Sequence, residues 1–268
     1  METLGSDTGN ETGHKRFFGI ELARLLSEKI IAQDPNFPAQ AFLADTEASG
    51  LTELELLDRV DTLAHLLRKH LPQHYPDALE QLARIYGPEN PNETGMFTFG
   101  YWLWPVGSFI ATYGLDHPNE SIAAIKELTK RHTGEFAIRP YIAARPTETV
   151  EVMRGWTTSS NVHIRRLASE GLRPRLPWSK RLTLFITEPQ PIFEVLDTLK
   201  DDTSRFVQKS VANNLNDYLK GNRTDTLDLL IRWAANPTPQ RQWIIRHALR
   251  NELRRGSTDA QNILKHAL

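Results

Sequence analysis

The chain has 268 residues, and its 40% hydrophobic content is ample for one elongated domain or two compact ones. The absence of cysteine excludes disulfides, thiol chemistry, iron–sulfur clusters and cysteine-rich zinc sites. The formal net charge of −1 conceals an asymmetry: residues 1–130 hold 10 Lys and Arg against 19 Asp and Glu, whereas residues 131–268 hold 22 against 14.

The first residues of the chain carry almost no apolar side chains. Residues 1–13 are rich in Gly, Thr, Asp and Glu, which predicts a disordered or non-native tail ahead of a single domain over residues 14–268. This segment lacks the basic start and apolar core of a signal peptide, and no later apolar stretch is as long as a membrane span. We therefore expect a monomeric, cytoplasmic protein with no membrane partner.

Apolar residues recur at helical spacing through most of the chain. Over residues 14–31 they stand at Phe18, Leu22, Leu25, Leu26 and Ile30, as on one face of a helix. The same pattern predicts helices over residues 39–43, 51–71, 76–85, 101–113, 120–131, 134–144, 147–156, 191–199, 205–219, 224–234, 240–254 and 259–266. No segment alternates as a strand would between turn signals.

A loop over residues 87–100, rich in Gly, Pro and Asn, leads into an aromatic cluster. Its members are Phe97, Phe99, Tyr101, Trp102 and Trp104. Such rings either stack on nucleobases or pack in a core, and core packing is the more common role beside a Pro-Val-Gly bend.

Residues 161–178, NVHIRRLASEGLRPRLPW, combine an arginine-rich helix with a proline-containing loop. Gly171 and Pro174 predict where the helix ends, because glycine relaxes a helix C-terminus and proline cannot continue it. Glu170 therefore lies near a helix end among arginines. It is either a structural ion-pair partner or a negative charge held for a cation.

Two later segments repeat this order of residues: SRFVQKSVANNLNDYL at 204–219 and QWIIRHALRNELRRG at 242–256. Aligning Ile164 with Val207 and Ile245 gives periods of 43 and 38 residues, and periods near 40 are typical of HEAT-like helical pairs. We predict an all-α fold, a curved α-solenoid of HEAT-like repeats.

The basic half of such a solenoid can line one surface with positive charge, for which a polyanion is the expected partner. A soluble scaffold with uneven charge is the alternative. We expect no metal or nucleotide cofactor, since HExxH and Gly-rich phosphate loops are absent and Pro72 interrupts the helical spacing of His70 and His74.

Four phrases carry a family resemblance: ELTKRHTGEFAIRPYI at 127–142, HIRRLASEGLRPRLPW at 163–178, LKDDTSRFVQKSVANNLND at 199–217 and WIIRHALRNELRRG at 243–256. They resemble the DNA alkylation-repair glycosylases of the AlkC and AlkD type, and the AlkC branch in particular. The resemblance extends from about residue 14 to the C-terminus. Some AlkC members add an immunoglobulin-like domain after the repeats, and this chain ends at Leu268 without one, so we expect the contacts of that domain to be absent or replaced.

The resemblance implies removal of positively charged alkylated bases, such as 3-methyladenine and 3-methylcytosine, from double-stranded DNA by hydrolysis of the N-glycosidic bond. A cationic base leaves readily and needs little help from a general acid, whereas the sugar becomes oxocarbenium-like. Carboxylates beside the sugar stabilise that charge and can orient the attacking water.

By the same resemblance, the catalytic acids are Glu135 in GEFAIRP, Glu170 in RRLASEG and Asp217 in ANNLND, and Trp178 in RPRLPW contacts the lesion. Without the resemblance, Asp217 would be a polar residue near a helix end, and Trp178 would be a core aromatic between repeats.

The basic residues then acquire a role in holding a bent duplex by its phosphates. The candidates are Arg139, Arg165, Arg166, Arg173, Arg175, Lys180, Arg246 and Arg250. A solenoid offers a groove in place of a deep base-flipping pocket, so bulky or cationic lesions should be tolerated. Two alternatives remain: a HEAT-like module that binds DNA or protein without catalysis, and a carbohydrate glycosidase, for which so many cations would be unusual.

Overall fold

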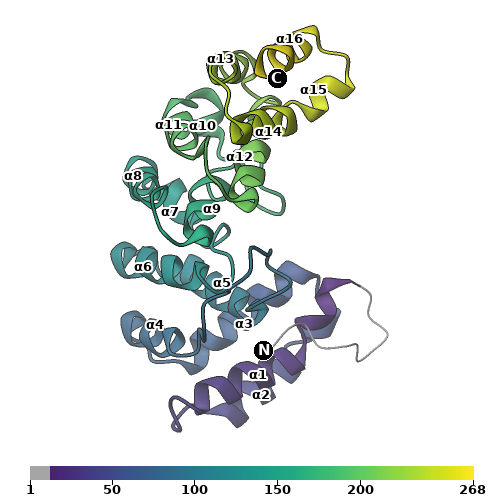
Figure 1. Cartoon of the computed structure of the whole chain (residues 1–268). Coiled ribbons are helices and arrows are strands. Elements are labelled where there is room, and N and C mark those ends of the chain that lie inside the picture. Colours follow the sequence, from purple (N-terminus) through teal and green to yellow (C-terminus); the bar gives the residue numbers. More distant parts are fainter. Residues whose placement is uncertain (1–12) are drawn as a thin grey trace. The chain divides into compact units, whose positions relative to one another are not determined.

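The computed structural model of the protein describes residues 13–268, so the tail predicted at 1–13 lies outside the described residues except for Gly13. Within that range the chain is helical and contains no strand. It divides into two compact units, residues 1–141 and 142–268, whose helices are labelled in Figure 1. The predicted all-α fold is confirmed.

The N-terminal unit begins with short helices and contains two predicted helices in broken form. The segment 14–31 splits into a 3-10 turn and α1, and 51–71 splits into a 3-10 turn and α3. The elements are η1 His14–Phe17, α1 Ile20–Ile31, α2 Ala39–Ala48, η2 Leu51–Glu53, α3 Leu56–His70, α4 Tyr75–Ala83, η3 Tyr101–Leu103, α5 Trp104–Tyr113 and α6 Pro118–Thr129.

The aromatic cluster of this unit belongs to its core. Phe99, Trp102 and Trp104 are buried, and the Trp104 ring contacts that of Phe18 edge-on, with 5.4 Å between the ring centroids. The core interpretation is therefore confirmed for these three rings, whereas Phe97 and Tyr101 are half-buried.

Helix α7, Arg139–Ala144, crosses the boundary between the units, and the C-terminal unit then continues with further helices in pairs. They are α8 Pro146–Trp156, α9 Val162–Glu170, α10 Thr183–Thr187, α11 Gln190–Leu199, α12 Arg205–Tyr218, α13 Arg223–Ala234, α14 Pro239–Ala248, α15 Arg250–Arg254 and α16 Thr258–Ala267.

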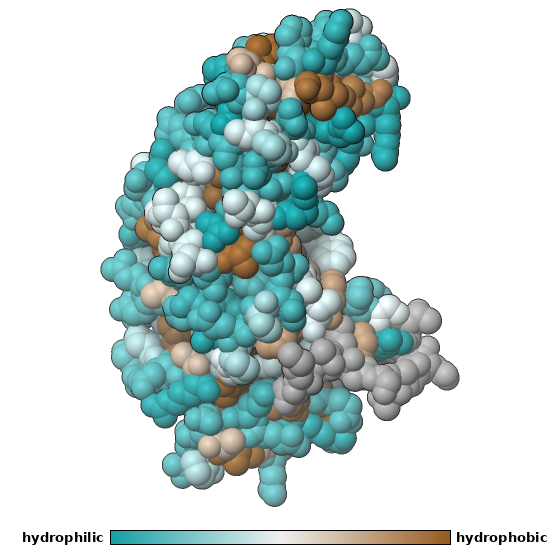
Figure 2. Space-filling view, viewed as in Figure 1, coloured by the Kyte–Doolittle hydropathy of each residue, from teal (hydrophilic) through white to brown (hydrophobic). Residues whose placement is uncertain are grey.

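Two layers organise the C-terminal unit. Helix α12 packs between α9 and α14, while α8, α11 and α13 pack behind them as the second member of each pair (Figure 1). Ile164, Val207 and Ile245, the residues that align the repeats, lie one in each helix of the α9–α12–α14 layer, and none is exposed. The helical-repeat prediction is confirmed. The face drawn in Figure 2 is largely hydrophilic over this unit.

The C-terminal half also differs in places from the predicted elements, beginning at α7. Helix α7 begins at Arg139 and not at 134, because Pro140, which lacks an N–H, fits only the first turn of a helix. The segment 240–254 is broken at Leu249 into α14 and α15, and the short helix α10 was not predicted.

Candidate active site

Helices α9, α12 and α14 each begin at a side chain that accepts hydrogen bonds from the first turn. Asn161 caps α9, Ser204 caps α12 and Thr238 caps α14. Such caps satisfy backbone N–H groups that have no partner within the helix. They fix where each helix starts and therefore which side chains lie near its end.

Two asparagines of α12 bind the C-terminal ends of its neighbours. Asn214 Nδ2 donates to the carbonyl of Ser169 in α9 at 2.8 Å, and Asn216 Nδ2 donates to the carbonyl of Ala248 in α14 at 2.7 Å. Carbonyls in the last turn of a helix lack internal partners, so these amides set the position of the three helices relative to one another. Both asparagines are buried.

Glu170 lies at the end of α9 with its carboxylate directed to charged and polar partners. Its Oε1 is 2.8 Å from Arg173 Nη1 and 3.5 Å from Arg166 Nη2. Its Oε2 accepts a hydrogen bond of 2.6 Å from Ser210 Oγ on α12. Only 8% of the Glu170 side chain is exposed.

Arg173 also binds Asp217, the second predicted acid of this unit. Its Nε and Nη2 lie 2.9 and 2.8 Å from Asp217 Oδ2, and Lys220 Nζ lies 3.5 Å from Oδ1. The structure therefore brings Glu170 and Asp217 together around one guanidinium.

The charges of this cluster stabilise one another. Burial alone would raise the pKa of Glu170, but Arg166, Arg173 and the Ser210 hydrogen bond outweigh it and hold that pKa below its usual range. Burial likewise opposes the charge of Arg173, whereas Glu170 and Asp217 raise the pKa of its guanidinium. Glu170 is therefore a carboxylate at neutral pH and is suited to stabilising positive charge, not to acting as a general acid.

Trp178 lies in the loop between α9 and α10 with unusual backbone geometry. Its φ is 61°, and it is the one non-glycine residue among residues 13–268 with a positive φ. The side chain is 56% exposed. A large residue in this region is strained, so the loop presents the indole to solvent at a cost. This contradicts the alternative interpretation of Trp178 as a core aromatic.

Glu135 and Arg139 belong to the N-terminal unit. Glu135 is buried in the turn that precedes α7, and Arg139 is the first residue of that helix. Only 6% of Arg139 is exposed, which argues against the predicted phosphate contact.

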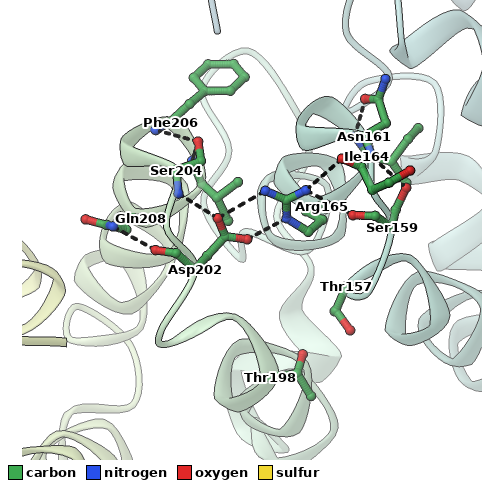
Figure 3. A network of polar contacts seen from close by, with 12 residues as sticks. Thr157, Ser159, Asn161, Ile164, Arg165, Thr198, Asp202, Ser204, Phe206 and Gln208 are labelled. Atoms are coloured by element: carbon green, nitrogen blue, oxygen red, sulfur yellow. Dashed lines mark hydrogen bonds and ion pairs between the residues drawn. The ribbon is translucent and has the colours of Figure 1, made fainter. Parts of the chain in front are cut away.

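Arg165 binds protein groups on three sides (Figure 3). Its Nε lies 2.6 Å from Asp202 Oδ2, and its Nη1 donates to the carbonyls of Ser159 and Ser160 at 2.9 and 3.2 Å. Asp202 also accepts from the Ser204 backbone N–H at 2.8 Å. Arg165 thus joins two loops, which gives it a structural role and argues against its predicted phosphate contact.

A second arginine repeats this arrangement one repeat later. Arg241 of α14 binds Asp201 through Nε at 2.9 Å and the carbonyl of Asn236 at 2.6 Å. The adjacent Asp201 and Asp202 thus each hold an arginine, one from the following and one from the preceding repeat.

The remaining basic candidates differ in exposure. Arg166 is mostly covered and lies over the Phe206 ring, with Cζ 5.0 Å from the centroid. Arg175 donates to the carbonyl of Lys220 at 3.4 Å, and Arg250 is half-buried. Lys180 and Arg246 are exposed, so these two are the most accessible of the predicted set.

Sequence reasoning missed Ser210, although it stands between the aligned Val207 and the predicted Asp217. Its hydrogen bond to Glu170 bridges α12 and α9. The repeat spacing did not mark it directly, because the period of 43 residues aligns Glu170 with Asn213, about one helical turn beyond Ser210.

The described residues hold neither a helix that could span a membrane nor a group of metal-ligand side chains. No helix among them is long and apolar enough to cross a membrane. Within the same range, no three His, Asp or Glu side chains gather as a possible set of metal ligands.

The fold and the site define an all-helical repeat protein. The family model described as DNA alkylation repair enzyme matches residues 132–252. The chain is 36% identical to the Pseudomonas fluorescens alkylpurine DNA glycosylase AlkC, solved bound to DNA containing an abasic site analog, with a TM-score of 0.85 over 95% of this chain and 68% of AlkC. The chain belongs to the family of DNA alkylation repair enzymes, in its AlkC branch.

Two further proteins are similar to this chain, one in sequence and one in structure. The uncharacterized protein YhaZ of Bacillus subtilis strain 168 is 34% identical over 246 residues, which cover 92% of this chain. The chain spans 66% of the length of YhaZ. AlkD2 from Streptococcus mutans is 20% identical with a TM-score of 0.40, covering 85% of this chain and 96% of AlkD2, a likeness too low to carry an argument.

Proposed function

We propose that this protein is a DNA glycosylase that releases positively charged alkylated bases, including 3-methyladenine and 3-methylcytosine, as the first step of base excision repair. The observation that carries the proposal is the 36% identity, over 95% of the chain, to a glycosylase solved on abasic-site DNA. The pairing of the Glu170 and Asp217 carboxyl groups around Arg173 supports it, because a departing cationic base leaves positive charge on the sugar.

In this mechanism the carboxylates act electrostatically. At about 4 Å and an effective dielectric constant of about 20, one charge pair contributes roughly 4 kcal/mol, which is about a thousandfold in rate. Glu170 is the main candidate, Asp217 supports it from α12, and Glu135 is proposed as a third acid. The exposed Trp178 is proposed to meet the lesion.

Arg173 raises a specific alternative. Both carboxylates are bound by this one guanidinium, as they would be in a structural ion-pair network. A helical-repeat module that binds DNA without releasing a base is therefore the second candidate function. In the catalytic proposal, Arg173 must turn away from Glu170 or share it with the substrate, since a carboxylate can accept about four hydrogen bonds.

The test is release of free base from duplexes that carry 3-methyladenine, 3-methylcytosine or neutral lesions, with binding to undamaged duplex measured in the same salt. The proposal predicts release of the cationic bases, and loss of that release in Glu170→Gln while binding persists. Binding without release of any base supports the non-catalytic module, and release of small neutral lesions alone contradicts the proposed substrate class.

A further inference from the structure

Side chains of helices α12 and α14 contact each other at two points. Arg205 lies over the Trp243 ring, with Cζ 4.1 Å from the ring centroid. Lys209 stands between Arg205 and Asn213 along α12. Arg250 Nη2 donates to Asn213 Oδ1 at 3.0 Å. The α12 members recur every four residues, so they share one face of that helix.

This face gathers positive charge without nearby counter-ions. Arg205, Lys209 and Arg246 are exposed, and no carboxylate of residues 13–268 forms an ion pair with any of them. Asp201 and Asp202, the acidic residues just before α12, are bound to Arg241 and Arg165.

The pKa values of His247 and Arg250, two half-buried residues of this face, are lowered. Burial and then the positive charges of Arg250 and Lys209 lower the pKa of His247. Burial also lowers the pKa of Arg250. The negative charge of Asp217 opposes this shift, whereas the positive charges of Arg173 and Arg254 add to it. Positive groups held together against their own repulsion are stabilised when an anion binds between them.

Two groups contact the Trp243 ring. His247 stacks on it with 4.8 Å between ring centroids and 13° between ring planes, and Arg205 lies at 4.1 Å. A guanidinium over an aromatic ring can still donate N–H groups to a phosphate.

We propose that Arg205, Lys209 and Arg246 form a phosphate-binding strip for the backbone of double-stranded DNA, in which Trp243 and His247 hold the Arg205 guanidinium in place. That the ligand is DNA rests on the proposed function. The side chains of the strip would bind DNA at a place separate from the carboxylates. It offers phosphate contacts that Arg139, which is buried, and Arg165, which binds Asp202, are poorly placed to make.

The test is equilibrium binding of the whole protein to an undamaged duplex over a series of salt concentrations. Arg205→Gln and Lys209→Gln should each weaken binding several-fold and lower the slope of log K against log salt by about 0.9, the value for one phosphate contact. The matched control is Arg232→Gln on α13, an exposed arginine in the other helix layer, which should keep the wild-type slope.

Unfolding by urea, followed for every variant, separates loss of contact from loss of fold. Wild-type slopes in folded Arg205→Gln and Lys209→Gln, or an equal fall in Arg232→Gln, would overturn the strip. Base release from methylated duplex by the wild-type protein tells the two proposals apart. Release with unchanged slopes removes the strip and leaves the glycosylase, whereas lowered slopes without release leave the strip and remove the glycosylase.

Discussion

Glu170 and Asp217 lie on neighbouring helices and share one guanidinium. Arg173 reaches Glu170 Oε1 through Nη1 at 2.8 Å and Asp217 Oδ2 through Nε at 2.9 Å. Any change to one acid therefore alters the charge balance around the other, so a loss of activity must be separated from a loss of stability.

Glu170→Gln should lower the free energy of unfolding at neutral pH by about 3 kcal/mol, the lower end for breaking a buried ion pair, because Asp217 still partners Arg173. The folded-state pKa of Glu170 is below its unfolded value, so the contribution is present above the unfolded pKa and is lost as pH falls through the folded one. Urea unfolding at neutral and acidic pH should show the gap between wild type and variant closing in acid. An equal gap at both pH values contradicts this account of the carboxylate.

Ser210→Ala should move the acidic limb of the profile of base-release rate against pH to a higher pH. The Ser210 hydroxyl donates to the charged form of Glu170 at 2.6 Å, and a hydrogen bond to a charged group contributes about 1.5–3 kcal/mol, or roughly one pKa unit or more. Loss of this bond raises the pKa of Glu170, so release should fail at a pH about one unit higher than in wild type. A purely structural serine would lower the rate at every pH and leave the limb in place.

Trp178→Gly should separate stability from activity. Glycine adopts a φ of 61° without strain, so the free energy of unfolding should stay the same or rise by about 1 kcal/mol. Base release should fall roughly tenfold or more, since stacking of one base on an aromatic ring contributes about 1–3 kcal/mol. Thermal unfolding and base release measured on the same sample check the effects on stability and on activity. An unchanged rate of base release removes Trp178 from the proposed site.

Much of the fold follows from local sequence. The stop at Gly171 predicts the end of α9 closely, because glycine acts within a few residues of a helix end. The break at Leu249 was missed, since both sides of it continue a helical pattern and no proline or glycine marks it.

The candidate site was less predictable because partners distant in sequence decide what an arginine does. Arg165 and Arg205 each stand near the start of a basic helix, yet Asp202 binds the first and an aromatic ring holds the second. Spacing along a helix gives the face on which a residue lies, but it does not tell which carboxylate of the next repeat reaches it.

The most direct test of the central claim is single-turnover release of 3-methyladenine by wild type, Glu170→Gln and Asp202→Asn. Asp202 is the matched control, because its side chain is only 5% exposed and pairs with Arg165 much as Glu170 pairs with Arg173. Each variant is assayed where circular dichroism shows it folded. The account predicts a loss of about a thousandfold for Glu170→Gln and a rate close to wild type for Asp202→Asn. Equal losses in both variants, or an undiminished rate in Glu170→Gln, would contradict it.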